Sequence, residues 1–194
     1  MRRFVVVCRT AIASADFSLD DLPGTSGRLD VPLRCIRAAL LTSHGLRRDV
    51  KIDLVLLGGP KAPRVVRIDG ASVKFLRPDE RPLATLLKKA LDAHDAIEGA
   101  AFTEVRPGIF IARGGLDLVL SESEPTYVLD EAGSDVRTQR LAEHATFVLG
   151  DQLGFDDETR ARLGALAKIS LGPVSVHSDD AVAILSNELD RAHH

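Results

Sequence analysis

Two short apolar segments near the C-terminal end, each running into glycine, constrain the fold of this chain more than any other feature. Residues 146–151 read TFVLGD, and residues 168–173 read KISLGP. A charged segment over residues 156–167, predicted to be helical, lies between them, and another predicted helix begins at Ser178 with a serine cap. Continuous apolar runs bounded by turn residues are typical of strands buried in a parallel sheet. This alternation predicts an α/β fold with a mostly parallel sheet.

The glycines at the strand ends predict a ligand pocket. Glycine beside a polar residue is expected where the backbone approaches a ligand closely, although a single such glycine is as consistent with a plain strand end. A third strand, predicted at residues 127–129, leads into a further glycine-containing loop. In open α/β sheets, ligands bind just outside the carboxyl ends of the strands. The predicted pocket residues are Leu129, Gly133, Gly150, Asp151, Gly154, Ile169, Ser170, Leu171 and Gly172, with His177 at its mouth.

The motifs that the chain lacks narrow the ligand class. The sequence contains no Gly-x-Gly-x-x-Gly fingerprint and no P-loop lysine motif, which disfavours a dinucleotide or a nucleoside triphosphate. A pocket of backbone amides and small or apolar side chains suits an adenosine ring joined to a sulfonium amino acid better. Two cysteines are too few for a disulfide framework or a zinc cluster, so we expect no metal.

The remaining patterns predict one compact domain. The apolar run at residues 4–8 is too short for a membrane span or a signal peptide, so we expect a cytoplasmic protein. The other predicted elements are a strand at residues 4–8, an ordered functional loop over 9–27, a helix over about 30–43, a strand at 52–57, a hairpin of 64–68 with 72–76 around Asp69-Gly70-Ala71, a helix from Pro82, a strand at 109–112 and a helix over 135–143.

Charge is distributed unevenly along the chain. Residues 1–81 hold 15 Lys and Arg against 9 Asp and Glu, whereas residues 82–194 hold 10 against 19. A basic half predicts a polyanionic partner, because phosphate contacts bind without regard to sequence. Most of the basic residues are arginine and not lysine, and a genome rich in G and C explains that preference equally well. The candidate RNA contacts are Arg28, Arg34, Arg47 and Arg48, the last two also suiting cations that cap a helix C terminus.

Several motifs resemble a known enzyme family. The runs FVLGDQLGF at residues 147–155 and ISLGP at 169–173, followed by His177-Ser178, resemble the C-terminal core of the SPOUT RNA methyltransferases. The runs FSLDDLPG at residues 17–24, GRLD at 27–30 and SHGLRRDV at 43–50 are similar to those of the archaeal tRNA pseudouridine-54 N1-methyltransferases and their bacterial relatives. The resemblance covers nearly the whole chain.

This resemblance implies a fold and an activity. It implies a single SPOUT domain over residues 1–194, with helices on both faces of the sheet, an RNA-facing N-terminal part and a C-terminal trefoil knot over about 125–192. It also implies a homodimer that binds S-adenosylmethionine and methylates N1 of pseudouridine, first of all at position 54 in the T-loop of tRNA. Another RNA, such as rRNA, and a non-catalytic RNA-binding role remain alternatives. The relatives generally carry cysteine where this chain has Ala181.

The implied reaction points to two catalytic candidates. Methylation at N1 requires an imide-type nitrogen to lose its proton, so a carboxylate must accept the proton or cations must stabilise the anion. Asp30 and Arg28 supply one group of each kind at the start of a predicted helix. A helix cap and a surface ion pair are the alternative roles for these two residues.

Overall fold

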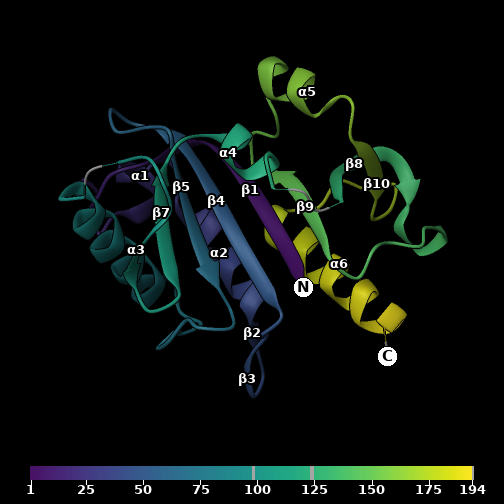
Figure 1. Ribbon diagram of the computed structural model, residues 1–194, viewed down its shortest axis with the longest axis horizontal. Coiled ribbons are helices and arrows are strands. Elements are labelled where there is room, and N and C mark those ends of the chain that lie inside the picture. Colours follow the sequence, from purple (N-terminus) through teal and green to yellow (C-terminus); the bar gives the residue numbers. More distant parts are fainter. Residues whose placement is uncertain (98, 123–124, 194) are drawn as a thin grey trace.

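The computed structural model describes residues 1–97, 99–122 and 125–193. Within them, eight strands form one sheet in the order β10-β8-β9-β1-β4-β5-β7-β6 (Figure 1). Neighbours from β10 to β4 pair in parallel, and those from β4 to β6 pair antiparallel. The strands are β1 (Arg2–Ile12), β4 (Val50–Gly58), β5 (Arg64–Asp69), β6 (Thr103–Arg106), β7 (Ile109–Arg113), β8 (Thr126–Asp135), β9 (Ala145–Gly150) and β10 (Ala167–Ser170).

Helices cover both faces of the sheet, one face more fully than the other. The remaining elements are α1 (Leu22–Thr25), α2 (Asp30–Leu40), α3 (Glu80–Asp95), α4 (Leu116–Leu120), α5 (Asp157–Leu163), α6 (Ser178–His193), the 3-10 turn η1 (Val136–Thr138) and a small hairpin of β2 (Leu41–Thr42) with β3 (Gly45–Leu46).

The alternation of side chains along β1 explains why its central residues, 4–8, are all apolar. Phe4 and Val6 face a core shared with the buried sides of α2, α3 and α6. Val5 and Val7 face a second core that includes side chains of α4 and α5. Because β1 lies between β9 and β4 inside the parallel half and is covered on both faces, each of the residues 4–8 favours an apolar side chain.

Helix α6 runs from the carboxyl ends of the parallel strands back to their amino ends. The helix starts beside the carboxyl end of β9, where the Ser178 hydroxyl donates to the Gly150 carbonyl at 2.9 Å. It then runs back towards the start of β1 (Figure 1), where Asp190 pairs with Arg2 and Arg47. The hydroxyl of Ser178, expected to cap the helix, therefore bonds to a neighbouring strand end. None of the helices in the described ranges is long and apolar enough to cross a membrane.

The predicted α/β class and mostly parallel sheet are confirmed, with four parallel pairings against three antiparallel ones. The predicted hairpin is wrong. Residues 72–76 form no strand, because β5 pairs instead with the strand that precedes it, β4, and with the more distant strand β7. An Asp-Gly turn signals a reversal of the chain but does not specify its pairing partner.

Three predicted boundaries are also wrong. The helix expected over residues 30–43 ends at Leu40, because the next residues form the hairpin of β2 and β3. The helix expected over 135–143 is only the short turn η1, which the Asp135 carboxylate starts by accepting from the Arg137 amide at 2.9 Å. The loop expected over 9–27 is shorter, because β1 continues to Ile12 and α1 forms before Gly27.

Candidate functional site

A cavity of about 820 Å³ lies at the carboxyl ends of β8, β9 and β10, between them and the first turns of α2 and α6. Its volume is within the usual range for sites that hold a small molecule or a cofactor. The parallel pairing of β9 with both β8 and β1 aligns these strand ends. The predicted residues that line the cavity are Leu129, Gly150, Asp151, Gly154, Ile169, Leu171, Gly172 and His177, together with Arg28 and Arg34.

Two predicted pocket residues lie behind the cavity wall. A Cβ atom on Gly133 would approach the backbone of Ile169 at 2.7 Å, so this glycine permits the close packing of β8 against β10. The Ser170 hydroxyl donates to the Gly172 carbonyl at 3.0 Å and accepts from the Gly172 amide at 3.2 Å, which holds the turn after β10. Both residues shape the wall rather than line it.

The turn after β9 is a tightly packed part of the wall. A Cβ atom on Gly150 would lie 2.8 Å from the Cα atom of Gly154, which itself has a φ of +65°. The Asp151 carboxylate accepts from the amides of Leu153 at 2.9 Å and Arg9 at 2.7 Å. Burial raises the pKa of Asp151 and outweighs these hydrogen bonds. The turn therefore presents bare backbone to the cavity.

This packing leads to a prediction about ligand binding. We expect Gly150→Val to weaken cofactor binding at least tenfold, because its side chain has no room without displacing the turn that lines the cavity. Isothermal titration calorimetry measures the effect. Gly45→Ala is the matched control, because a Cβ atom at that position meets nothing within 4 Å. Equal affinity of Gly150→Val and wild type would contradict a binding site at this turn.

Two arginines and one carboxylate form a cluster on the opposite wall. Asp30, only 4% exposed, accepts from Arg28 Nε at 2.9 Å and Nη2 at 3.1 Å, and from Arg34 Nη1 at 3.0 Å. Arg34 also lies 3.6 Å from the Asp179 carboxylate of α6. Burial acts to raise the pKa of Asp30, but the hydrogen bonds from the two arginines outweigh it, so the pKa is lowered. The cluster is therefore ionised at neutral pH.

The backbone at this cluster is unusual. Gly27 and Arg28 both lie in the left-handed region, with φ of +64° and +68°. A Cβ atom on Gly27 would lie 1.9 Å from the Thr10 carbonyl oxygen, so the loop is pressed against the end of β1. Left-handed backbone is uncommon for arginine and is often found at functional sites. The N-cap position of α2 is Leu29, which forms no side-chain cap. Asp30 is the first residue of the helix and not its cap, and its carboxylate pairs with Arg28 and Arg34.

The other two predicted RNA contacts lie at the opposite end of the parallel strands. Arg47 pairs with Asp190 at 2.7 Å, and Arg48 donates to the carbonyls of Gly70 at 2.8 Å and Val73 at 3.3 Å. Both side chains thus have partners within the chain. Their contact with RNA stays a prediction.

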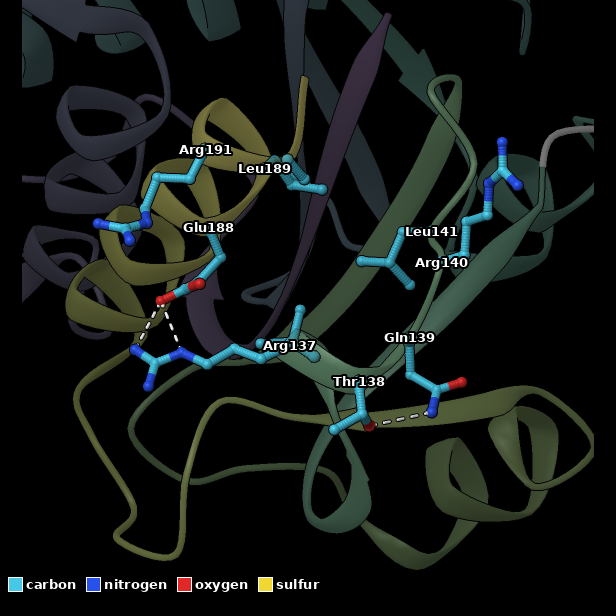
Figure 2. A pocket seen from close by; sticks show the side chains of 10 residues that line it. Arg137, Thr138, Gln139, Arg140, Leu141, Glu188, Leu189 and Arg191 are labelled. Atoms are coloured by element: carbon cyan, nitrogen blue, oxygen red, sulfur yellow. Dashed lines mark hydrogen bonds and ion pairs between the residues drawn. The ribbon is translucent and has the colours of Figure 1, made fainter. Parts of the chain in front are cut away.

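A second cavity, of about 600 Å³, lies between η1 and the end of α6. Figure 2 shows Arg137 reaching across it to Glu188, to which it donates at 2.7 Å and 3.0 Å. None of the residues predicted for cofactor or RNA binding lines it. Most of the residues predicted for the cofactor line the larger cavity instead.

Some residues of the larger cavity carried no recognisable signal in the sequence. Asp179 lies in the first turn of α6, where the sequence indicates no more than a favourable charge at a helix N terminus, yet its carboxylate joins the arginine cluster across the cavity. Ala181 lies on the wall, at the position where cysteine was expected from the resemblance. In the part of the chain that the structure describes, no three His, Cys, Asp or Glu side chains are placed to hold a metal ion.

Comparison with known proteins assigns the family. A family model described as "Putative SAM-dependent RNA methyltransferase" matches residues 1–194. The chain belongs to this family. The tRNA (pseudouridine(54)-N(1))-methyltransferase of Methanococcoides burtonii is 40% identical over 98% of this chain and 96% of its own, and that of Halobacterium salinarum is 41% identical over 99% and 97%.

The solved structures agree with the family at the level of the fold. Archaeoglobus fulgidus Nep1 bound to S-adenosylhomocysteine superimposes with a TM-score of 0.69 at 15% identity, covering 99% of this chain and 98% of that one. The chain is thus an S-adenosylmethionine-dependent RNA methyltransferase with a SPOUT-type sheet.

The larger cavity of this methyltransferase fits the cofactor. Leu129, Ile169 and Leu171 offer apolar surface for an adenine ring, and the backbone at Gly150 and Gly172 offers hydrogen bonds for its edge. Carboxylates at the start of α6 also line the cavity, which suits the positive charges of the amino acid portion and the sulfonium. When bound there, the cofactor supplies the reactive methyl group.

Proposed function

We propose that this methyltransferase transfers a methyl group to N1 of pseudouridine in RNA, with position 54 in the T-loop of tRNA as its substrate. Relatives named for that reaction are about 40% identical over nearly the full length of both chains. The observation that carries the proposal is the ionised cluster of Arg28, Asp30 and Arg34 on the wall of the cofactor cavity.

The cluster suits the chemistry of this nucleoside. In pseudouridine the sugar is attached through carbon, so N1 keeps a proton and must lose it before it can attack the methyl carbon. The negative charge that remains spreads over the ring. Arginine side chains fixed in place by a buried carboxylate stabilise such a charge without reorganising during the reaction. We propose that Arg28 and Arg34 perform this role for the pyrimidine ring.

The lowered pKa of Asp30 argues against a role for this residue as the proton acceptor. A carboxylate whose pKa is lowered by two arginines is a weak proton acceptor. We therefore propose that Asp30 positions Arg28 and Arg34, and that the proton of N1 passes to solvent. This choice favours the ion-pair alternative over the sequence-based hypothesis that Asp30 is the base.

We further propose that the protein is a cytoplasmic homodimer. Val174 and Val176 line the cofactor cavity and are 74% and 43% exposed. Apolar side chains that gather at the rim of a site often mark a surface that a partner covers. A second copy that covers this rim would complete the walls of each active site.

We also propose a single domain, with an RNA-facing N-terminal part and a knotted cofactor-binding part over about residues 125–192. The route of the chain supports a trefoil knot in this region. β9 lies between β8 and β1, β10 follows on the far side of β8, and α6 then returns to the face of the sheet that α2 covers.

Methylation of defined transcripts tests the function. We expect the purified protein with S-adenosylmethionine to convert pseudouridine 54 of a tRNA to its N1-methyl derivative, detected by mass spectrometry of the nucleosides. A tRNA with uridine at position 54 is the matched control, because the N1 atom of uridine is occupied by the sugar bond. Methylation of ribosomal RNA but not of tRNA would show that ribosomal RNA, and not tRNA, is the substrate. Cofactor binding without any turnover would favour a non-catalytic role.

A further inference from the structure

The segment after β5 presents an aromatic side chain to solvent in a strained conformation. Phe75 is 92% exposed, which makes it the most exposed large hydrophobic residue in the part of the chain that the structure describes. Its backbone φ is +60°, in the left-handed region. For a bulky side chain this conformation costs about 1–2 kcal/mol. Neither the strained backbone nor the exposed ring of Phe75 is explained by packing within the chain, which indicates a functional role.

The turn that precedes Phe75 is held firmly in place. The Val73 amide donates to the Asp69 carbonyl at 2.9 Å, and the Gly70 amide donates to the Val50 carbonyl at 2.9 Å. Arg48 donates to the carbonyls of both Gly70 and Val73. The Val73 side chain is 1% exposed and anchors the segment in the core. The turn is therefore rigid, and it places Phe75 in solvent two residues after the buried Val73.

Close packing beneath the turn fixes it further. Gly108, at the end of the turn between β6 and β7, has a φ of +71°, and a Cβ atom there would lie 2.1 Å from the Val73 amide nitrogen. The carbonyl of this glycine accepts from the Asp69 amide at 2.9 Å. The segment cannot move inward to cover Phe75 without breaking these contacts. Its ring is available for an external partner.

The residues beside Phe75 indicate the chemistry of that partner. Lys74 and Arg77 are both exposed. An exposed aromatic ring between cations is the usual arrangement for binding unpaired nucleotides, in which a base stacks on the ring and the cations contact phosphates. The segment also belongs to the basic half of the chain.

We propose that Phe75 stacks on an unpaired base of the RNA substrate, with Lys74 and Arg77 on neighbouring phosphates. This inference rests on the proposed function only in that RNA is the substrate. β5 is antiparallel to β4 (Figure 1), so the C-terminal end of β5, which leads to Phe75, lies at the end of the sheet opposite the cofactor cavity. The stacked base is therefore a different nucleotide from the one that is methylated. Phe75 adds affinity and orientation for the RNA at a distance from the reacting atoms.

The test compares three variants at one position. We expect Phe75→Ala to weaken binding of a tRNA transcript by about 5- to 100-fold in fluorescence anisotropy at fixed salt, which is the range for loss of one stacked base. Phe75→Trp should bind like wild type, because its ring still stacks. Phe75→Leu should behave like Phe75→Ala, since it keeps an apolar side chain but has no aromatic face. Binding of S-adenosylmethionine should be unchanged in all three.

The other outcomes overturn the inference. Wild-type affinity in Phe75→Ala, or in Phe75→Leu, would exclude stacking. A change of oligomeric state in Phe75→Ala, measured by analytical ultracentrifugation, would make this segment a contact between protein chains. If wild type methylates RNA and Phe75→Ala binds and methylates equally well, only this inference fails. If wild type neither binds nor methylates RNA, the proposed function fails with it.

Discussion

Replacement of Asp53 by alanine is expected to lower the free energy of unfolding by about 3–5 kcal/mol, the range for removing one partner of a buried ion pair. Asp53 is fully buried in β4. It accepts from Arg67 Nε at 2.8 Å and Nη2 at 2.9 Å, and from Arg3 Nε at 2.7 Å. Its loss leaves the guanidinium groups of Arg3 and Arg67 without their buried counter-charge, and only the exposed carboxylate of Glu122 remains paired with them. The desolvation of those groups is then no longer offset.

The same network contains a matched control. Glu122 also pairs with Arg3 and Arg67, at 2.8 Å and 2.7 Å, but its side chain is 41% exposed. We expect Glu122→Gln to cost less than about 1 kcal/mol, because solvent screens an exposed ion pair. Urea denaturation followed by circular dichroism measures both variants. A loss in Asp53→Ala no larger than that in Glu122→Gln would show that the buried network does not stabilise the fold.

Replacement of Arg28 by alanine is expected to lower kcat by about 10²- to 10³-fold, the effect of removing one preorganised group that stabilises an anion. Arg28 lines the cofactor cavity and is fixed by two hydrogen bonds to Asp30. The affinity for S-adenosylmethionine should change little, since the loss falls on the transition state. Single-turnover methylation of tRNA and calorimetry with the cofactor separate the two quantities. Equal losses in both would make Arg28 a structural residue.

The pH dependence of methylation separates the possible roles of Asp30. Its pKa is lowered from 3.8 in the folded protein, so the ion pairs with Arg28 and Arg34 are fully present above that value. They are lost only as the pH falls through the lower folded pKa. We therefore expect no acidic limb from Asp30 between about pH 5 and 8. An acidic limb in wild type that disappears in Asp30→Asn would make Asp30 the proton acceptor.

The α/β class could be predicted because strands that are buried on both faces have apolar residues at consecutive positions. Residues 4–8 of β1 and residues 147–149 of β9 are continuous apolar runs for this reason. The antiparallel half was predicted less well. β5 has the composition of a hairpin strand, yet it pairs with the preceding strand β4 and with the distant strand β7, and not with residues 72–76. A turn signal is local, whereas strand pairing is decided by all the strands that compete for the same edge.

The walls of the cofactor cavity could be predicted for a related reason. Parallel strands end at the same side of a sheet, so glycines that follow β9 and β10 had to lie close together once the sheet was assumed. Gly133 and Ser170 were assigned to the lining because sequence shows proximity to a strand end but not the direction of a side chain.

The amino-acid sequence by itself determined the apolar strands, the glycines at their ends and the uneven charge of the two halves, since these follow from local composition and periodicity. Only the tertiary structure decided which charges meet. It joined Arg34 to Asp179 of α6, placed the Arg48 guanidinium on the carbonyls of the segment before Phe75, and buried Asp53 between two arginines. Ion pairs between distant residues depend on the packing of whole elements, and no local pattern in the sequence records that packing.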